Sequence, residues 1–136
     1  MHTITLYVLT GFIGWTLFLL ILMEAIRTSF LFNRTLAPNE FKPDNSNLPP
    51  FMQRLARAHA NCIESFPFIG GLLIVALVLD RTGVTDMLAP WLLGARLFQS
   101  TIQVISNNVI AANLRFFAFV VQVAICVYWL GALLIG

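Results

Sequence analysis

The sequence predicts an all-α integral membrane protein, built as a four-helix bundle in a single domain. Hydrophobic residues make up 59% of the 136 residues and charged residues only 10%, whereas soluble domains carry roughly 25% charged residues. The apolar residues gather in four segments long enough to cross a bilayer. A net charge of +2, scattered along the chain, is too small to indicate a nucleic-acid partner.

The first predicted helix covers about residues 4–27. This segment is long enough to span a membrane and lacks the small-residue cleavage site of a signal peptide, so we expect a membrane helix. The polar connection that follows, about residues 28–50, contains prolines among asparagine, aspartate and serine residues. These prolines exclude a continuous helix, and they are Pro38, Pro43, Pro49 and Pro50.

The other three predicted helices cover about residues 51–79, 85–106 and 114–134. The second contains Pro67, which removes a backbone donor and crowds the preceding turn, and this predicts a kink. A turn at residues 80–83 leads into the third helix, and a connection with several asparagines leads into the fourth.

Basic residues concentrate at one end of the predicted bundle. Arg81 is the one basic residue clearly on the opposite side. The positive-inside rule therefore places the first loop in the cytoplasm and both termini on the other side of the membrane. The basic residues near the first and third connections are Arg27, Arg34, Lys42, Arg54, Arg57 and Arg115.

The second helix carries a stripe of polar side chains. Arg57, Asn61 and Glu64 stand at positions i, i+4 and i+7, which places a cation, an amide and a carboxylate on one helix face. Charge is costly inside lipid, so the stripe either binds a ligand or forms interhelical ion pairs that fix the packing. In the second case, the candidate partners of Glu64 are Arg57, Arg96 and Arg115.

A second polar face lies on the third helix, where Arg96, Gln99, Gln103 and Ser106 are spaced i, i+3, i+7 and i+10. Arg96 is well inside an apolar segment, and such a residue normally faces the bundle interior or a wet cavity. Glutamines also join helices by hydrogen bonds without any ligand. We therefore expect the two polar faces to turn toward each other or toward a neighbouring subunit.

The two cysteines indicate no metal site. Cys62 and Cys126 lie inside apolar stretches without the spacing of metal ligands. We expect two reduced thiols in the core or facing lipid, and neither a disulfide nor a bound metal.

The second helix resembles the signature of a known family. The pattern Arg-x-x-Arg-Ala-His-x-Asn-x-x-Glu-x-x-Pro, from Arg54 to Pro67, is similar to that of the MAPEG family, the membrane-associated proteins in eicosanoid and glutathione metabolism. The chain length, the long first loop and the later Asn113-Leu114-Arg115 also resemble that family. The resemblance implies a homotrimer of four-helix protomers, with glutathione bound between neighbouring subunits near the cytoplasmic side.

The resemblance also implies roles for single residues. Arg57, Asn61 and Glu64 match the residues that hold the glutathione peptide, and Arg115 matches the catalytic arginine that lowers the pKa of the thiol. A nearby cation favours the thiolate, which is the nucleophile. The resemblance also implies a role in glutathione binding for Arg27 and Arg96, and we expect Gln99 and Gln103 to take part in binding as well.

Some positions depart from the eicosanoid enzymes of the family. Gln99 and Gln103 stand where those enzymes carry aromatic or histidine residues, and Phe119 stands one turn after Arg115 in place of a tyrosine. A glutamine can hydrogen-bond a carboxylate or an amide, but it lacks the stacking and the acidity of a phenol.

These patterns leave two functions open. The first is a glutathione-dependent membrane transferase or peroxidase that acts on a lipophilic electrophile or a lipid hydroperoxide, and the intact stripe on the second helix favours it. The second is a catalytically degenerate membrane scaffold or partner-binding protein that does not use glutathione, favoured by Gln99, Gln103 and Phe119. A channel or transporter is disfavoured, because the sequence shows no internal repeats or broken helices. The predicted partners are further copies of the chain, membrane lipid and a lipophilic substrate.

Overall fold

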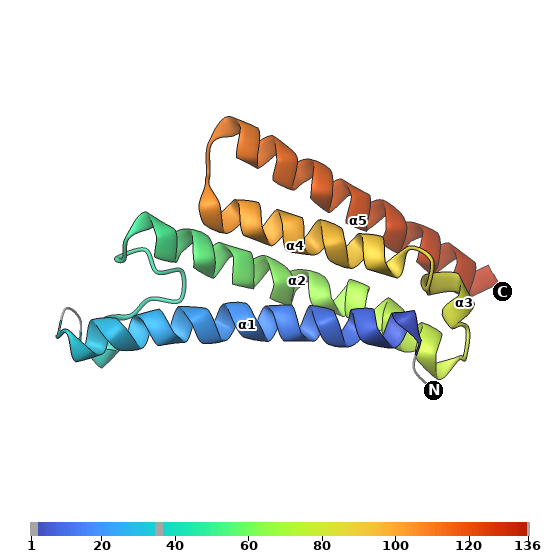
Figure 1. The fold of residues 1–136 in the computed structure, drawn as a ribbon, viewed down its shortest axis with the longest axis horizontal. Helices are drawn as coiled ribbons and strands as arrows, with labels where there is room; N and C mark the ends of the chain where they lie inside the picture. The colour runs from blue at the N-terminus through green and yellow to red at the C-terminus, as the bar shows by residue number, and fades with distance from the viewer. Residues whose placement is uncertain (1–2, 35–36, 136) are drawn as a thin grey trace.

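The structure, a computed structural model, describes residues 3–34 and 37–135. It confirms the all-helical fold with four main helices (Figure 1). Two short segments lie between them, the 3₁₀-helix η1 (Pro38–Glu40) and the single-turn helix α3 (Thr82–Thr85). The main helices are α1 (Ile4–Phe32), α2 (Pro50–Val78), α4 (Ala89–Ile105) and α5 (Val109–Ile135).

Helix α1 ends later than the sequence predicts, at Phe32 and not near residue 27. Its polar last turns are compatible with a helix because their hydroxyl groups bond back to helix carbonyls. The Thr28 hydroxyl donates to the Glu24 carbonyl at 2.8 Å, and the Ser29 hydroxyl donates to the Ile26 carbonyl at 2.6 Å. Such local bonds let polar residues stay within the helix.

The starts of the last two main helices also differ from the predicted ones. α4 begins at Ala89 because residues 82–85 form the separate helix α3, and Pro90 occupies the first turn of α4, where the missing N–H costs nothing. α5 begins at Val109, not near residue 114. The Asn108 side chain accepts a hydrogen bond from the Ala111 N–H at 2.8 Å and so caps this earlier start.

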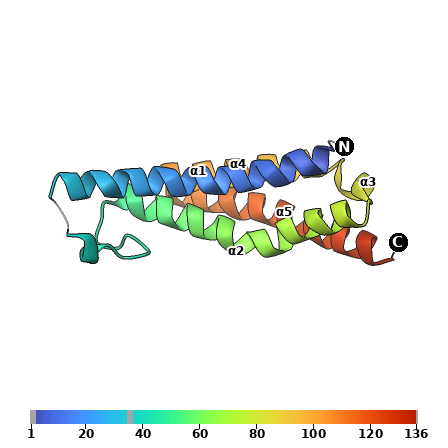
Figure 2. The ribbon, with the colours of Figure 1, turned by 90° about the horizontal axis from the view of Figure 1, so that it is seen from below.

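The four main helices run up and down along one long axis. Figures 1 and 2 place the start of α1, the end of α5 and helix α3 at one end of the bundle. The first loop and the connection between α4 and α5 lie at the other end. α1 packs against α2 and α4, while α5 packs mainly against α4 and less extensively against α2. The structure therefore has the antiparallel order expected of a chain that crosses a membrane four times.

Contacts at the end of the bundle that holds α3 help to fix this order. The backbone N–H of Thr5, near the start of α1, donates to the Asp86 carboxylate at 2.8 Å, and the Thr5 hydroxyl donates to the same oxygen. Arg81 donates to the carbonyls of Leu133 and Ala132 at 2.9 and 3.0 Å. A cation bonded to the last carbonyls of a helix stabilises its C-terminus, so Arg81 caps α5.

A small core coexists with a large apolar outer surface. Phe12, Leu55, Leu92 and Trp129, one from each main helix, are fully buried. In an apolar window of α1, α2 and α5, only 28%, 33% and 28% of the residues are buried, so most of these residues keep some exposed surface. Among the described residues, these three helices are long and apolar enough to cross a membrane individually, whereas α4 has 17 residues.

Candidate functional site

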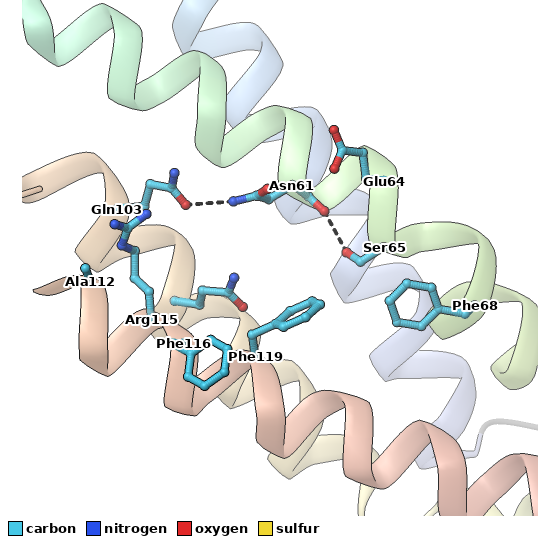
Figure 3. A pocket seen from close by; sticks show the side chains of 10 residues that line it. Asn61, Glu64, Ser65, Phe68, Gln103, Ala112, Arg115, Phe116 and Phe119 are labelled. Carbon is cyan, nitrogen blue, oxygen red and sulfur yellow. Dashed lines mark hydrogen bonds between the residues drawn. The ribbon is translucent and has the colours of Figure 1, made fainter.

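A cavity of about 450 Å³ opens where α2, α4 and α5 face one another (Figure 3). This volume lies within the range of roughly 300–1,000 Å³ that is usual for small-molecule sites. Its wall combines one carboxylate, one guanidinium and three amide side chains with several aromatic rings. The lining residues are Asn61, Glu64, Ser65, Phe68, Gln99, Gln103, Ala112, Arg115, Phe116 and Phe119.

The cavity brings together five of the eight residues that the sequence proposes for glutathione. They come from three helices, Asn61 and Glu64 from α2, Gln99 and Gln103 from α4, and Arg115 from α5. The polar faces of α2 and α4 therefore do turn toward each other. Helix α5 completes the site because it packs beside α4 and carries Arg115 in its second turn.

Glu64 and Arg115 place opposite charges on the same cavity. Glu64 is exposed and forms no ion pair with any arginine in the part of the chain that the structure describes. The interhelical ion pair considered from the sequence is thus not formed within one chain. Arg115 donates from Nη2 to the Asn107 Oδ1 at 3.1 Å, while its buried Nε has no partner among the described residues. Both charges are available to a ligand that carries an ammonium and an anion.

Two amide side chains bridge α2 and α4 at the cavity wall. The Asn61 Nδ2 donates to the Gln103 Oε1 at 2.8 Å, as Figure 3 shows. Asn61 also serves as a backbone acceptor, because its carbonyl receives the Ser65 hydroxyl at 2.8 Å. These bonds hold the polar side of the cavity in place before any ligand binds.

Arg96 does not reach the cavity. It is fully buried, and its Nε donates to the Gln122 Oε1 at 3.0 Å. Gln122 is fully buried as well, and its Nε2 donates to the Gln99 Oε1 at 2.8 Å and to the Ala118 carbonyl at 3.1 Å. The guanidinium carbon lies 5.7 Å from the centre of the Phe12 ring. Hydrogen bonds through the side chains of Gln122 and Gln99 therefore connect Arg96 to the cavity.

Arg27 also lies outside the cavity and holds the first loop. Its guanidinium donates to the Asn45 Oδ1, at 2.9 Å from Nε, and to the Lys42 carbonyl at 3.1 Å. It also pairs with Glu24 at 2.9 Å. Asn45 is fully buried and has a φ of 57°. Its Nδ2 donates to the Met52 carbonyl at 2.7 Å. Arg27 thus ties the loop to the end of α1 and the start of α2.

Arg57, the third predicted residue outside the cavity, is exposed on α2 one turn from Asn61. It makes no hydrogen bond or ion pair with the other described residues. Its side chain is therefore free to meet a ligand or a second molecule.

An apolar groove of about 640 Å³ between α2 and α5 adjoins the polar cavity. Phe68 and Phe119 line both spaces, so the aromatic side of the cavity continues directly into the groove. The remaining lining residues of the groove are Pro67, Gly71, Leu72, Val75, Val123, Cys126, Val127 and Leu130. The site thus joins a polar compartment to a lipid-like one.

The match to a family model decides the family. The MAPEG family model matches residues 5–135, which is nearly the whole chain. The chain belongs to the MAPEG family. It is therefore an integral, multi-pass membrane protein with the four-helix bundle of that family. MAPEG proteins include glutathione transferases and peroxidases and commonly bind glutathione. No curated protein and no solved structure gives a significant match to this chain.

The sequence did not reveal every residue of the site. Ser65, Phe68 and Ala112 line the cavity but carry no distinctive signal. Gln122, which joins Arg96 to Gln99, does carry one, since it is a lone amide within the apolar residues 116–135. An isolated polar residue at that depth normally faces the bundle interior and has a partner, so Gln122 could have been found.

Proposed function

We propose that this MAPEG protein binds glutathione in the cavity between α2, α4 and α5 and directs its thiolate against a lipophilic electrophile or a lipid hydroperoxide. The observation that carries the proposal is the pair of opposite charges, Glu64 and Arg115, on one cavity with glutamine amides between them. Glutathione offers an ammonium, two carboxylates, peptide groups and a thiol, and this wall complements the ammonium, the peptide groups and the thiolate.

Each residue has a defined task in this proposal. Glu64 accepts the ammonium group, and Asn61, Gln99 and Gln103 hydrogen-bond the peptide. Arg115 lies near the sulfur and favours the thiolate. In the transferase reaction, the sulfur forms a bond to an electrophilic carbon, which either expels its leaving group or passes the electron pair to a neighbouring atom that takes a proton. In the peroxidase reaction, two glutathione molecules give one disulfide, and the hydroperoxide becomes an alcohol and water.

The apolar groove supports a lipophilic second substrate. Its wall is almost entirely hydrocarbon, and it meets the polar cavity at Phe68 and Phe119. A substrate dissolved in the bilayer can lie along the groove and place its reactive atom beside the sulfur. Removing water from the reacting groups strengthens the electrostatic action of Arg115.

A membrane scaffold that does not use glutathione is the second candidate. It is favoured by the bond between Asn61 and Gln103, which joins α2 to α4 without a ligand, and by the absence of a phenol at position 119. Calorimetric titration of the purified protein with glutathione separates the two candidates. Binding, with conjugation or peroxidase turnover above background, supports the enzyme. No heat of binding and no turnover leaves the scaffold.

Glu64→Gln tests the proposed ammonium contact. The change keeps the shape of the side chain and removes its charge, leaving the ammonium group of the ligand uncompensated at about 1–3 kcal/mol, so affinity falls about 10- to 100-fold. Asp80→Asn is the matched control, because Asp80 is exposed in the turn after α2 and does not line the cavity. Equal affinity in Glu64→Gln and the control would exclude this role of Glu64.

We further propose that the first loop faces the cytoplasm and that both termini face the opposite side. The support is the basic residues near the end of α1 and the starts of α2 and α5, including Arg27, Arg54 and Arg115. Figure 1 places these helix ends on the side of the first loop. Reporter fusions to either terminus should both signal a non-cytoplasmic location. A cytoplasmic signal from either terminus would contradict this orientation.

A further inference from the structure

A chain of hydrogen bonds leads from a buried cation to the cavity. Arg96 and Gln122 have no exposed surface, and Gln99 is only 6% exposed, at the cavity wall. The bonds run from Arg96 Nε to Gln122 Oε1 and from Gln122 Nε2 to Gln99 Oε1. Gln122 is held by Arg96 and Gln99 is held by Gln122, and Gln99 faces the proposed ligand.

Chemistry alone fixes the direction of this chain. A guanidinium can only donate, so Gln122 must turn its carbonyl oxygen toward Arg96 and its amino group away. The Ala118 carbonyl, which can only accept, receives the same amino group and requires the same orientation. Gln99 must then accept from Gln122 through its oxygen. The amino group of Gln99 is what remains for the cavity.

The other amide pair of the cavity has no such constraint. Asn61 and Gln103 bond to each other without a cation, and the bond is kept if both amides are turned round together. Gln103 can therefore donate or accept as a ligand requires. Gln99 differs from Gln103 because the buried Arg96, acting through Gln122, fixes which end of the Gln99 amide faces the cavity.

We propose that Arg96 is a positioning residue that acts through Gln122 to hold Gln99 as an obligate hydrogen-bond donor to a carboxylate or peptide carbonyl of the ligand. This inference rests on the proposed glutathione site. It explains why a buried arginine that reaches no ligand stands in this bundle. A guanidinium enclosed in an apolar membrane interior is costly, and two of its nitrogens, Nη1 and Nη2, have no partner among the described residues.

Gln122→Glu is expected to reverse the hydrogen bond between residues 122 and 99 without breaking it. A carboxylate at position 122 still accepts from Arg96, and the two form an ion pair, so the protein should stay folded. The carboxylate cannot donate, however, so Gln99 must turn its amino group inward to satisfy it. Gln99 then shows an oxygen to the cavity. Its amino protons, exposed to cavity water in the wild type, become buried.

The measurement is hydrogen exchange of glutamine side-chain amides, by NMR on 15N-glutamine-labelled protein in lipid nanodiscs. In the wild type, the Gln99 amino group should exchange fast and that of Gln122 slowly. In Gln122→Glu, exchange at Gln99 should slow by about tenfold or more, and the affinity for glutathione should fall about tenfold, because an oxygen would then face the acceptor groups of the ligand. The Gln99→Leu variant assigns the Gln99 resonance.

The control is Gln53→Glu, the same chemical change at a residue that bonds the Leu48 carbonyl outside the cavity. It should leave both exchange and affinity unchanged. Unchanged exchange at Gln99 in Gln122→Glu would overturn the proposal, even if glutathione binds. A protected Gln99 amino group in the wild type would overturn it even if the variant fails to fold. A wild type that binds no glutathione would remove the proposed function, and the exchange data would still decide the direction of the chain.

Discussion

Arg115 is the only cation among the described residues that line the cavity. Its guanidinium is anchored at one end by Asn107, and its Nε is buried without a partner in the described structure. The orientation of a guanidinium held in this way is restrained. A negative charge that develops beside it is therefore stabilised by a group that is already oriented.

Replacing Arg115 by Ala should lower turnover much more than binding. Without the cation, the pKa of the bound thiol rises, so less thiolate is present at neutral pH and turnover of a model electrophile falls about tenfold or more. The pH–rate profile should shift to higher pH, because more alkaline solution is needed to form the thiolate. Steady-state rates across pH, with calorimetric affinities, measure both effects.

Lys42→Ala is the control for Arg115→Ala, since it removes one exposed cation of the first loop without touching the cavity. Figure 1 places this loop at the same end of the bundle as the start of α5. It should leave the pH–rate profile in place. If Arg115→Ala loses affinity in proportion to turnover, Arg115 binds the ground state and does not act mainly on the thiolate.

Single residues also show where the sequence was informative. Periodicity placed Asn61 and Glu64 on one face of α2 and Gln99 and Gln103 on one face of α4, and the structure brings these faces to one cavity. The pattern could not show which partner each side chain takes, because that depends on the rotation of each helix relative to its neighbours. Arg96 illustrates the gap. Its burial was predictable, whereas its connection through Gln122 required the position of α5.

At the scale of elements, α1 and the first loop behave as one unit. Arg27, near the end of α1, bonds the side chain of Asn45 and the Lys42 carbonyl, and Asn45 bonds the Met52 carbonyl on α2. The middle of the loop is therefore tied both to the end of α1 and to the first turn of α2. This is a structural role for an arginine to which the family resemblance assigned glutathione binding.

Replacing Arg27 by Ala should loosen the loop. It leaves the buried Asn45 side chain without its donors, a cost of about 1–3 kcal/mol to the local structure. Cleavage of residues 37–49 by a protease in mild detergent should accelerate about tenfold or more. The control, Glu24→Gln, breaks only the ion pair on the exposed side of Arg27 and should change little, because exposed pairs contribute little. Lost glutathione binding with an unchanged loop would instead support the role assigned by resemblance.

The boundaries of the elements were less predictable than their number. Four apolar segments were enough to predict four main helices, since each must bury its backbone polar groups in its own hydrogen bonds inside lipid. The ends depend on local bonds that hydropathy does not show. Asn108 caps α5 earlier than the apolar pattern suggests, and the hydroxyls of Thr28 and Ser29 let α1 continue past its charged residues.

At the scale of the whole molecule, one chain leaves its site incomplete. Glutathione carries two carboxylates and a thiolate in its reactive form, yet Arg115 is the one cation lining the cavity in the described chain. Glu64 and Arg57 are exposed on the same helix. A second copy of the chain, packed against α2, would bring further cations to the cavity and cover both charged side chains.

We therefore expect a homotrimer, in which α2 of one protomer packs beside helices of the next with Arg57 and Glu64 near the contact. Family membership supports an oligomer, and the sparse burial within α1, α2 and α5 leaves apolar surface for such contacts. Light scattering in a mild detergent should give a protein mass about three times that of one chain, after the detergent contribution is subtracted. A monodisperse monomer that still binds glutathione would contradict the trimer, because the remaining cations would then have to come from this chain alone.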